Sequence, residues 1–357
     1  MRIIQLLDAL DYGDGVSNDV IHQHELLDEM GVENQIYSKW YNERVSNYTR
    51  EIDTYRPEAD DLVLYHFSGK TFIIDQVSEY PGKRILRYHN VTPPAFFKDS
   101  NPQAYQNCKE GLEQLCAHLG RFDGFCADSP FNRSDLISYG ASLDAVDVLP
   151  IAMDLERLDS VRETPALAEQ LRKRPYILFV GRVAPNKCFE DILSAFETYY
   201  RYYDQETMLY LVGNCQQSDS YTASIMEQVS RLHAKEKIVF TGKVSDEDLY
   251  TYYRGASAFL CMSEHEGFCI PLLEAMVFDI PVIAYDSCAV PDTMGGSGIL
   301  LRKKDPALTA GLLHELMTDA SLRENILAKQ RENVALYRHD AMKRRLSTLI
   351  EKWEATQ

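Results

Sequence analysis

The chain has 357 residues, a formal net charge of −17, 45% hydrophobic residues and 25% charged residues. Its length predicts two domains of roughly 150 residues each, and its near-average composition excludes long disordered or fibrous segments. The acidic charge argues against broad, non-specific nucleic-acid binding, which depends on Lys and Arg to neutralise phosphates.

No run approaches the roughly 20 apolar residues that span a bilayer, and the opening MRIIQLLDALDYGDG is too short and too soon acidic for a signal peptide. We therefore expect a cytoplasmic protein. The cysteines show no CxxC spacing, so in a reducing compartment we expect free thiols rather than a disulfide or metal framework. The eight are Cys108, Cys116, Cys126, Cys188, Cys215, Cys261, Cys269 and Cys288.

Short apolar runs alternate with stretches of helical period along the whole chain, which is the pattern of parallel strands joined by crossover helices. The fold class is therefore α/β. In the first half, the pattern predicts strands at 3–7, 35–37, 62–66, 84–88, 124–127 and 146–149 and helices at 18–30, 102–118 and 130–139. In the second half it predicts strands at 176–180, 208–212, 238–241, 258–262, 282–284 and 298–300, and a helical tail from 305.

A Pro-bounded, charge-rich segment at 150–175 separates the two halves, and we place the domain boundary near Leu155. This predicts two doubly wound, Rossmann-like domains. Ligands in such open sheets bind beyond the carboxyl ends of the strands. We therefore look for chemistry in the loops that follow strands.

The segment SEHEGFCIPLLEAM places Glu266 and Glu274 on either side of Pro271. Proline suits the first turn of a helix, so the preceding loop is predicted to point amides toward an incoming anion. Carboxylates accept hydrogen bonds from hydroxyls, so the two acids suit a ligand with hydroxylated rings on both sides of a phosphate. The alternative is that both acids only complement the dipole of that helix.

The segment LFVGRVAPNKCFEDIL places Arg182 just after a strand and Lys187 before the next helix. A planar guanidinium and a compact ammonium together suit a diphosphate. The alternative is a solvated pair of surface cations. A weaker signal is LLDALDYGDGVSNDV, where Gly13 and Gly15 follow the first strand and would let the backbone approach a phosphate, or simply form a tight turn. It is not the GxGxxG fingerprint.

These three elements, in this order and spacing, resemble retaining glycosyltransferases of family 4, which have the GT-B architecture of two Rossmann-like domains facing across a cleft. The resemblance covers nearly the whole chain. It implies an acceptor-binding domain at 1–155, a nucleotide-sugar-binding domain at 156–338, and a helix at 339–357 that returns to the first domain. It implies no cofactor and no metal.

Residue by residue, the resemblance implies that Arg182 and Lys187 bind the donor diphosphate and that Gly15 lies against the phosphates. Glu266 with Gly267 and Phe268 would hold the sugar. The remaining implied donor contacts are Glu274 for the ribose and Lys243 and Val244 for the base.

Within that family, YHNVTPPAFF resembles bacterial polysaccharide enzymes, including mannosyltransferases. His89 matches a histidine near the hydroxymethyl edge of the donor sugar, which makes it a candidate catalytic residue together with Arg182, Lys187 and Glu266. His89 and Asn90 are also candidates for acceptor binding. A buried or capping histidine is the alternative for His89, and His66 is a weaker candidate.

Several positions depart from the family pattern. Cys188 and Cys269 stand where relatives often have glycine, so the local backbone, or the approach of the donor, is expected to differ. Asn214 and Cys215 depart likewise after the strand at 208–212. The acids of 246–248 spell a DxD motif, but Ser245 and Asp248 have capping-box spacing, so we expect a helix start rather than a metal site.

The leading hypothesis is therefore transfer of a hexose, with GDP-mannose favoured, to a glycan or lipid-linked glycan in the synthesis of lipopolysaccharide, capsule or another bacterial surface polysaccharide. Alternatives are a UDP-glucose or UDP-N-acetylglucosamine transferase, an epimerase or hydrolase of nucleotide sugars, and a non-catalytic partner subunit. A weak peripheral contact with the inner face of the membrane stays open, for example through residues 343–346 and Leu349.

Overall fold

The computed structural model describes residues 1–215 and 219–355. The chain divides into two compact units, each formed from segments that are distant in the sequence. Unit 1 comprises Met1–Ala95, Gln103–Asp154 and Tyr337–Gln357, and unit 2 comprises Phe96–Pro102 and Leu155–Leu336. The chain thus passes into unit 2 at Leu155 and returns to unit 1 at Tyr337, while residues 96–102 of the sequence-assigned first domain lie with unit 2. Residues 356–357 of the expected last helix lie outside the described residues.

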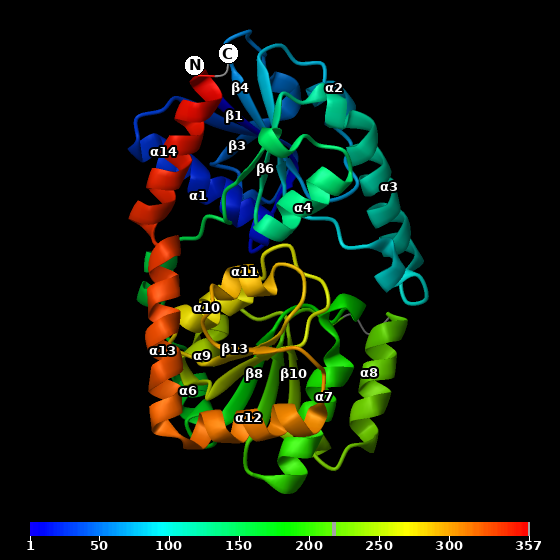
Figure 1. Cartoon of the computed structure of the whole chain (residues 1–357), viewed down its shortest axis with the longest axis vertical. Coiled ribbons are helices and arrows are strands. Elements are labelled where there is room, and N and C mark those ends of the chain that lie inside the picture. The colour runs from blue at the N-terminus through cyan, green and yellow to red at the C-terminus, as the bar shows by residue number, and fades with distance from the viewer. Residues whose placement is uncertain (216–218, 356–357) are drawn as a thin grey trace. The chain divides into compact units, whose positions relative to one another are not determined.

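Unit 1 is built on a seven-stranded parallel sheet of order β3-β2-β1-β4-β5-β6-β7 (Figure 1). The strand order reverses direction between β1 and β4, which is where open α/β sheets bind ligands. The strands are β1 Ile3–Leu10, β2 Asn34–Tyr41, β3 Thr49–Glu51, β4 Leu62–Phe67, β5 Lys83–Tyr88, β6 Gly124–Ala127 and β7 Val146–Val148. The helices are α1 Gly15–Glu29, α2 Ile74–Val77, α3 Pro102–His118, α4 Pro130–Ser138 and α14 His339–Ala355.

Helices cover both faces of this sheet because alternate strand residues point to opposite sides. Along β1, Ile4 packs in one core with α2, α3 and α4, whereas Ile3 packs in a second core with α1 and α14. From α14, the second core takes Met342, Leu346, Ile350 and Trp353. The helical tail therefore completes unit 1.

Unit 2 contains a six-stranded parallel sheet of order β10-β9-β8-β11-β12-β13. Its order reverses between β8 and β11. The strands are β8 Tyr176–Val180, β9 Met208–Val212, β10 Ile238–Gly242, β11 Ala258–Cys261, β12 Val282–Tyr285 and β13 Ile299–Leu301. The helices are α5 Leu155–Ser160, α6 Pro165–Leu171, α7 Phe189–Tyr202, α8 Ser220–Arg231, α9 Asp246–Gly255, α10 Ile270–Val277, α11 Val290–Met294, α12 Pro306–Thr318 and α13 Ala320–Val334.

Several short elements differ from the sequence-based expectation, among them helix α2, which was not predicted. The short edge strand β3 was not predicted, and the segment read as a linker contains α5 and α6. The start of α6 is anchored on α9, because the Thr164 amide donates to Thr251 Oγ1 at 2.9 Å and its hydroxyl donates to Asp248 Oδ1 at 2.6 Å. The segment between the halves is thus part of the packed structure of unit 2.

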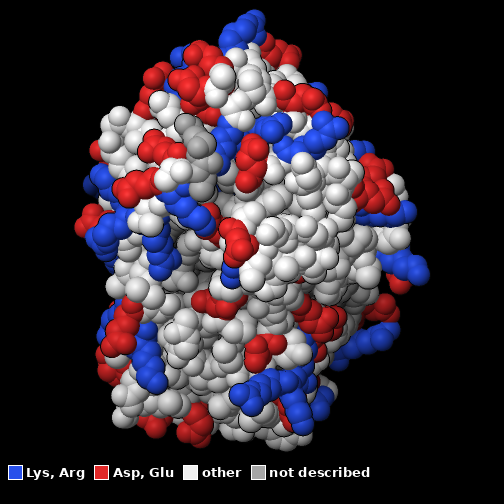
Figure 2. All heavy atoms as spheres, turned by 45° about the horizontal axis from the view of Figure 1, so that its top comes forward, with Lys and Arg blue, Asp and Glu red and all other residues white. Residues whose placement is uncertain are grey.

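Among the described residues, no helix combines the length and the apolar character needed to cross a bilayer. The example given for a peripheral membrane patch is wrong. Leu346 is buried in the core of unit 1 and Leu349 packs against that core, so neither can enter a membrane while unit 1 is folded. Figure 2 shows acidic and basic side chains interspersed over the face that it displays.

Candidate functional site

The loop after β8 carries the first pair of candidate residues. Arg182 is exposed and, within the described ranges, has no hydrogen-bond or ion-pair partner. The loop is tied to its neighbour, because the Gly181 amide donates to Val212 O at 2.8 Å and the Val183 amide donates to Asn214 O at 2.9 Å. Arg182 therefore projects from a fixed backbone with its guanidinium available to a ligand.

Lys187 and Glu266 form a buried ion pair. Lys187 Nζ lies 2.6 Å from Glu266 Oε1 and 2.7 Å from Oε2. Burial acts to lower the pKa of Lys187, but the Glu266 carboxylate outweighs it and the pKa is raised. Asn186 joins the two loops, since its Nδ2 donates to His265 O at 3.1 Å and its carbonyl accepts the Glu264 amide at 2.9 Å. Asn186 was not identified from the sequence.

Helix α10 begins beside this ion pair. Cys269 caps it in the left-handed region, with φ of 73°, and Pro271 lies in its first turn as expected. Phe268 is buried, and its carbonyl accepts a hydrogen bond from Thr293 Oγ1. A helix start favours anions, because its first N–H groups point out of the helix and its dipole is positive there. The start of α10 thus has the electrostatics that favour an anion.

Glu274 lies within α10, and among the described residues it has no ion-pair partner. Its Oε2 accepts a hydrogen bond from Tyr253 OH at 2.7 Å, and its side chain is almost fully buried. Burial raises the pKa of Glu274 to about 7. Glu274 can therefore both donate and accept hydrogen bonds near neutral pH.

The residues assigned to the base follow β10. Lys243 is exposed and Val244 is half-buried. The Gly213 amide donates to the carbonyl oxygen of Gly242, the residue before Lys243, at 3.1 Å. This hydrogen bond joins the loops after β9 and β10. Cations and amides of unit 2 thus lie in loops at the carboxyl ends of its strands.

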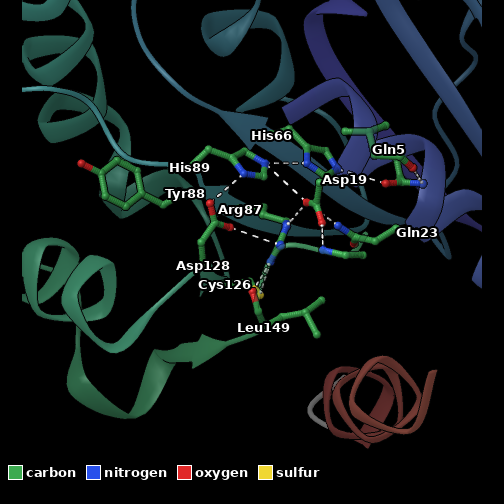
Figure 3. A network of polar contacts seen from close by, with 12 residues as sticks. Gln5, Asp19, Gln23, His66, Arg87, Tyr88, His89, Cys126, Asp128 and Leu149 are labelled. Atoms are coloured by element: carbon green, nitrogen blue, oxygen red, sulfur yellow. Dashed lines mark hydrogen bonds and ion pairs between the residues drawn. The ribbon is translucent and has the colours of Figure 1, made fainter. Parts of the chain in front are cut away.

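In unit 1, His89 belongs to a buried chain of polar side chains (Figure 3). Its Nε2 lies 2.9 Å from His66 Nδ1, and its Nδ1 lies 3.0 Å from Asp128 Oδ2. His66 Nε2 in turn lies 3.1 Å from Gln5 Oε1. The side-chain nitrogen of Gln5 donates to the carbonyl oxygen of Val20, which can only accept. The side-chain oxygen of Gln5 is therefore the atom that faces His66. The donor directions along this chain are thereby determined.

With Gln5 accepting, His66 carries its proton on Nε2 and accepts a hydrogen bond at Nδ1 from His89. Burial, together with the charges of His89 and Arg87, lowers the pKa of His66 well below its ordinary value, in agreement with a neutral ring. Nδ1 of His89 faces the Asp128 carboxylate, so Asp128 completes this chain of polar side chains.

The charged groups next to His89 are arranged around Arg87, which is fully buried. Its Nε donates to Asp19 Oδ2 at 2.9 Å, and its NH2 lies 3.2 Å from Asp128 Oδ1. Two carboxylates thus face one guanidinium, which gives the buried charge of Arg87 its partners. Asp19, Arg87 and Asp128 were not identified from the sequence, although an Arg inside the apolar run 84–88 was a usable signal.

Asn90 and Gly15 have local structural roles. Asn90 is buried in the left-handed region with φ of 73°, and its Nδ2 donates to Asn132 Oδ1 at 2.8 Å. Gly15 is the first residue of α1, which Asp14 caps, while the left-handed glycine of that turn is Gly13. An acceptor contact of Asn90 and a phosphate contact of Gly15 stay predictions.

The DxD sequence begins α9 as expected. Ser245 is its N-cap and accepts the Asp248 amide at 3.2 Å. Elsewhere, three groups of potential metal ligands occur among the residues described: Asp19, His66 and His89; Cys261, Glu266 and Cys269; Cys188, Asp191 and Glu264. Each is in contact with a protein cation, namely Arg87, Lys187 or Lys304.

Comparison with known proteins finds a family model that matches most of the second half. The model of "Glycosyl transferases group 1" matches residues 164–333. O-antigen chain mannosyltransferase B of Escherichia coli is 30% identical over 202 residues, covering 54% of this chain and 51% of that protein. D-inositol 3-phosphate glycosyltransferase of Nocardia farcinica is 30% identical over 218 residues, covering 58% and 47%. The chain thus spans about half the length of these curated relatives.

Solved structures share the fold. Sucrose-phosphate synthase from Thermosynechococcus elongatus superposes with a TM-score of 0.77 at 18% identity, covering all of both chains. HepE of Anabaena in complex with UDP-glucose superposes with a TM-score of 0.75 at 14% identity, covering 99% of this chain and all of the other. The two Rossmann-like units are therefore those of a GT-B fold.

Proposed function

Because residues 164–333 form a glycosyl transferases group 1 domain, we propose that the protein transfers a hexose from a nucleotide diphosphate sugar to a glycan or lipid-linked glycan. GDP-mannose is the favoured donor, and UDP-glucose or UDP-N-acetylglucosamine is the alternative. Relatives named as mannosyltransferases, including O-antigen chain mannosyltransferase B, support mannose and a role in surface polysaccharide synthesis. The protein would work at the cytoplasmic side of the membrane.

One observation carries this proposal: the Lys187–Glu266 pair lies beside the start of α10, with Arg182 exposed in the loop that also holds Lys187. The cations and amides suit a diphosphate, and Glu266 suits the hydroxyls of the sugar attached to it. Glu274 would hold the ribose, and Lys243 with Val244 would contact the base.

In the proposed reaction, the bond between the anomeric carbon and the diphosphate oxygen breaks, and the acceptor oxygen bonds to that carbon from the same face. The acceptor's proton passes to the departing phosphate oxygen. Negative charge grows on the diphosphate, so Arg182, Lys187 and the amides of α10 stabilise the transition state more than the ground state. The configuration at the anomeric carbon is retained, and no metal is required.

The test is an incubation of the full chain with GDP-mannose, with and without mannose-containing oligosaccharides, in the presence of EDTA. We expect GDP release that depends on the added glycan and a product with the α-anomeric configuration of the donor, as read by NMR. Release without any acceptor would support hydrolysis instead. Loss of turnover on chelation, with recovery on adding Mn²⁺, would contradict metal independence.

Arg182→Ala is the variant that tests this loop most directly. Arg182 is exposed, so removing its side chain leaves no buried charged group unpaired in the described part of the chain. We expect kcat/KM to fall roughly 100-fold with unchanged stability. Lys187→Ala leaves the Glu266 carboxylate buried and unpaired, so it should lower both activity and stability. Full activity of Arg182→Ala would remove the proposed role of this loop.

A further inference from the structure

Two cysteines of unit 2 lie close together next to the Lys187–Glu266 ion pair. Cys261 is the last residue of β11, Ala258–Cys261, and Cys269 caps α10. Their sulfur atoms and a carboxylate oxygen of Glu266 all lie within 4.8 Å of one another. Both thiols are free, and both residues are buried. The proposed transfer reaction uses neither sulfur.

The surroundings of Cys261 favour its thiolate. A hydrogen bond from the Cys269 thiol lowers the pKa of Cys261, although burial and the Glu266 carboxylate oppose this effect. The same hydrogen bond raises the pKa of Cys269 well above its ordinary value. Cys261 Sγ also lies 3.4 Å from the hydroxyl oxygen of Ser263, and Lys187 interacts electrostatically with both sulfurs. Because the thiolate is the nucleophile in sulfur chemistry, Cys261 is the sulfur that attacks.

A metal ion is the other species that two thiols and a carboxylate could hold. Both oxygens of Glu266 already contact Lys187 Nζ, at 2.6 and 2.7 Å, so a metal ion would have to share this carboxylate with an ammonium group. Oxidation of the two sulfurs leaves the ion pair in place. The arrangement therefore favours redox chemistry of the thiols over metal binding.

We propose that Cys261 and Cys269 are an oxidisable dithiol, which hydrogen peroxide converts to a disulfide, and that this bond weakens binding of the donor. The effect on the donor rests on the proposed transferase function. The formation of the disulfide does not. Hydrogen peroxide is small enough to reach buried sulfurs through local opening of the structure.

The reaction has two steps. In the first, the sulfur of Cys261 bonds to one oxygen of the peroxide and the O–O bond breaks, which gives a sulfenic acid and one water that carries away the thiol proton. In the second, the sulfur of Cys269 bonds to the sulfur of Cys261 and the S–O bond breaks. The hydroxyl leaves as a second water with the proton of Cys269. Each sulfur loses one electron, and the peroxide is reduced by two.

The disulfide would displace groups that are assigned to the donor. The two sulfurs are not bonded in the structure, so they must move together when the bond forms. Glu266, Gly267 and Phe268, which are assigned to the sugar, directly precede Cys269. A displacement of about 1 Å in a binding site can cost about 100-fold in rate. We therefore expect the oxidised protein to bind GDP-mannose at least about tenfold more weakly than the reduced protein.

The test starts from the reduced full chain, which is treated with hydrogen peroxide and then with an alkylating reagent. Proteolytic cleavage after Glu266 separates Cys261 from Cys269, so a disulfide between them keeps two peptides linked until reductant is added. Mass spectrometry detects this linked pair. Calorimetry measures the Kd for GDP-mannose before oxidation, after oxidation and after treatment with dithiothreitol. We expect the linked pair, a rise in Kd and its reversal by the reductant.

The variants show whether these two sulfurs are responsible. Cys269→Gly removes one thiol, and glycine suits the φ of 73° at this position. Its Kd should be the same with and without peroxide, and Cys261→Ser should behave likewise. Cys116→Ser is the matched control, because Cys116 is an exposed cysteine of unit 1, and it should respond to peroxide as the parent does. An equal rise in Kd in Cys269→Gly and the parent would overturn the link between the dithiol and the donor.

Failure of the proposed function would look different. If the linked peptides form but the reduced protein neither binds nor uses a nucleotide sugar, the dithiol stands, and its effect on the donor falls together with the transferase assignment. If hexose transfer occurs but peroxide yields no linked peptides, the dithiol falls and the transferase assignment stands. Linked peptides with an unchanged Kd would overturn the effect on the donor.

Discussion

Glu266 and Glu274 are both nearly buried, but their electrostatic surroundings are opposite. Glu266 forms an ion pair with Lys187, whereas the side-chain partner of Glu274 in the described part of the chain is the hydroxyl of Tyr253. An unpaired buried carboxylate is more stable when protonated, and this is why the pKa of Glu274 is raised from 4.5 to about 7. The two acids therefore respond differently to pH.

We predict that Glu274→Gln removes a pH dependence of stability. Between pH 4.5 and 7, the unfolded chain releases a proton that the folded protein keeps, so the free energy of unfolding falls as pH rises. The contribution of the protonated acid is fully present below pH 4.5 and is lost above 7. The loss is roughly 3 kcal/mol. Gln keeps an oxygen for Tyr253 and does not titrate.

Urea unfolding of both proteins from pH 4 to 8 measures this. The variant should match the parent at pH 4 and exceed its stability at pH 8. Glu236→Gln, which changes an exposed glutamate, should follow the parent at every pH. A variant whose stability parallels that of the parent across the range would contradict the raised pKa.

Site residues that belong to one local motif could be predicted from the sequence, whereas contacts between residues distant in the sequence could not. Arg182, Lys187 and Glu266 each follow a strand in a recognisable local motif, and the structure places each of them in such a loop. The ion pairs of Arg87 with Asp19 and Asp128 join β5 to α1 and to the end of β6. These residues are too far apart in the sequence for a local pattern to indicate that they are in contact. Likewise, nothing in the sequence showed that Lys187 neutralises Glu266.

At the scale of elements, the starts of α7 and α10 share one unusual feature. Each is capped by a cysteine in the left-handed region, Cys188 with φ of 51° and Cys269 with φ of 73°. Glycine adopts this conformation without strain, so the backbone at these two positions is one that a glycine would also adopt. The chain keeps a backbone that glycine favours while carrying a side chain there.

We predict that Cys188→Gly is more stable than Cys188→Ala by about 1 kcal/mol, because only the alanine retains a Cβ in the left-handed region. Cys108, inside helix α3, is the matched control. There glycine should be less stable than alanine by a similar amount. Denaturant unfolding of the four variants gives both differences. Alanine exceeding glycine at position 188 would show that the cap is not strained.

Elements with a periodic or apolar pattern could be predicted, including the three-residue strands β7 and β13, whereas short elements in polar segments could not. The strand β3 consists of three polar residues and has no apolar run to detect. Helices α5 and α6 are short and lie in a charged segment, and α6 is held by the tertiary contacts of Thr164 with α9 rather than by its own periodicity. Such elements depend on neighbours that are distant in the sequence.

At the scale of the whole molecule, each unit carries its own binding chemistry. Unit 2 presents Arg182 and the start of α10, which suit an anion. Unit 1 has a pocket at the carboxyl ends of β1 and β4, lined among others by Asp11, Trp40, Lys70 and Phe72. The two sites thus offer different groups to a ligand. Donor and acceptor should therefore each prefer one unit.

We predict that hydrogen exchange will separate the two ligands. GDP-mannose should slow amide exchange in peptides covering 181–189 and 266–274, because a ligand that binds the native state suppresses the local opening from which amides exchange. Neutral mannotriose should slow exchange in peptides covering 11–16 and 68–72, of which residues 71–72 are held by Gln114 and Asp8. Arg182→Ala should abolish the first protection and leave the second. Protection of 11–16 and 68–72 by GDP-mannose alone, with none at 181–189, would place the donor in unit 1 and reverse both assignments.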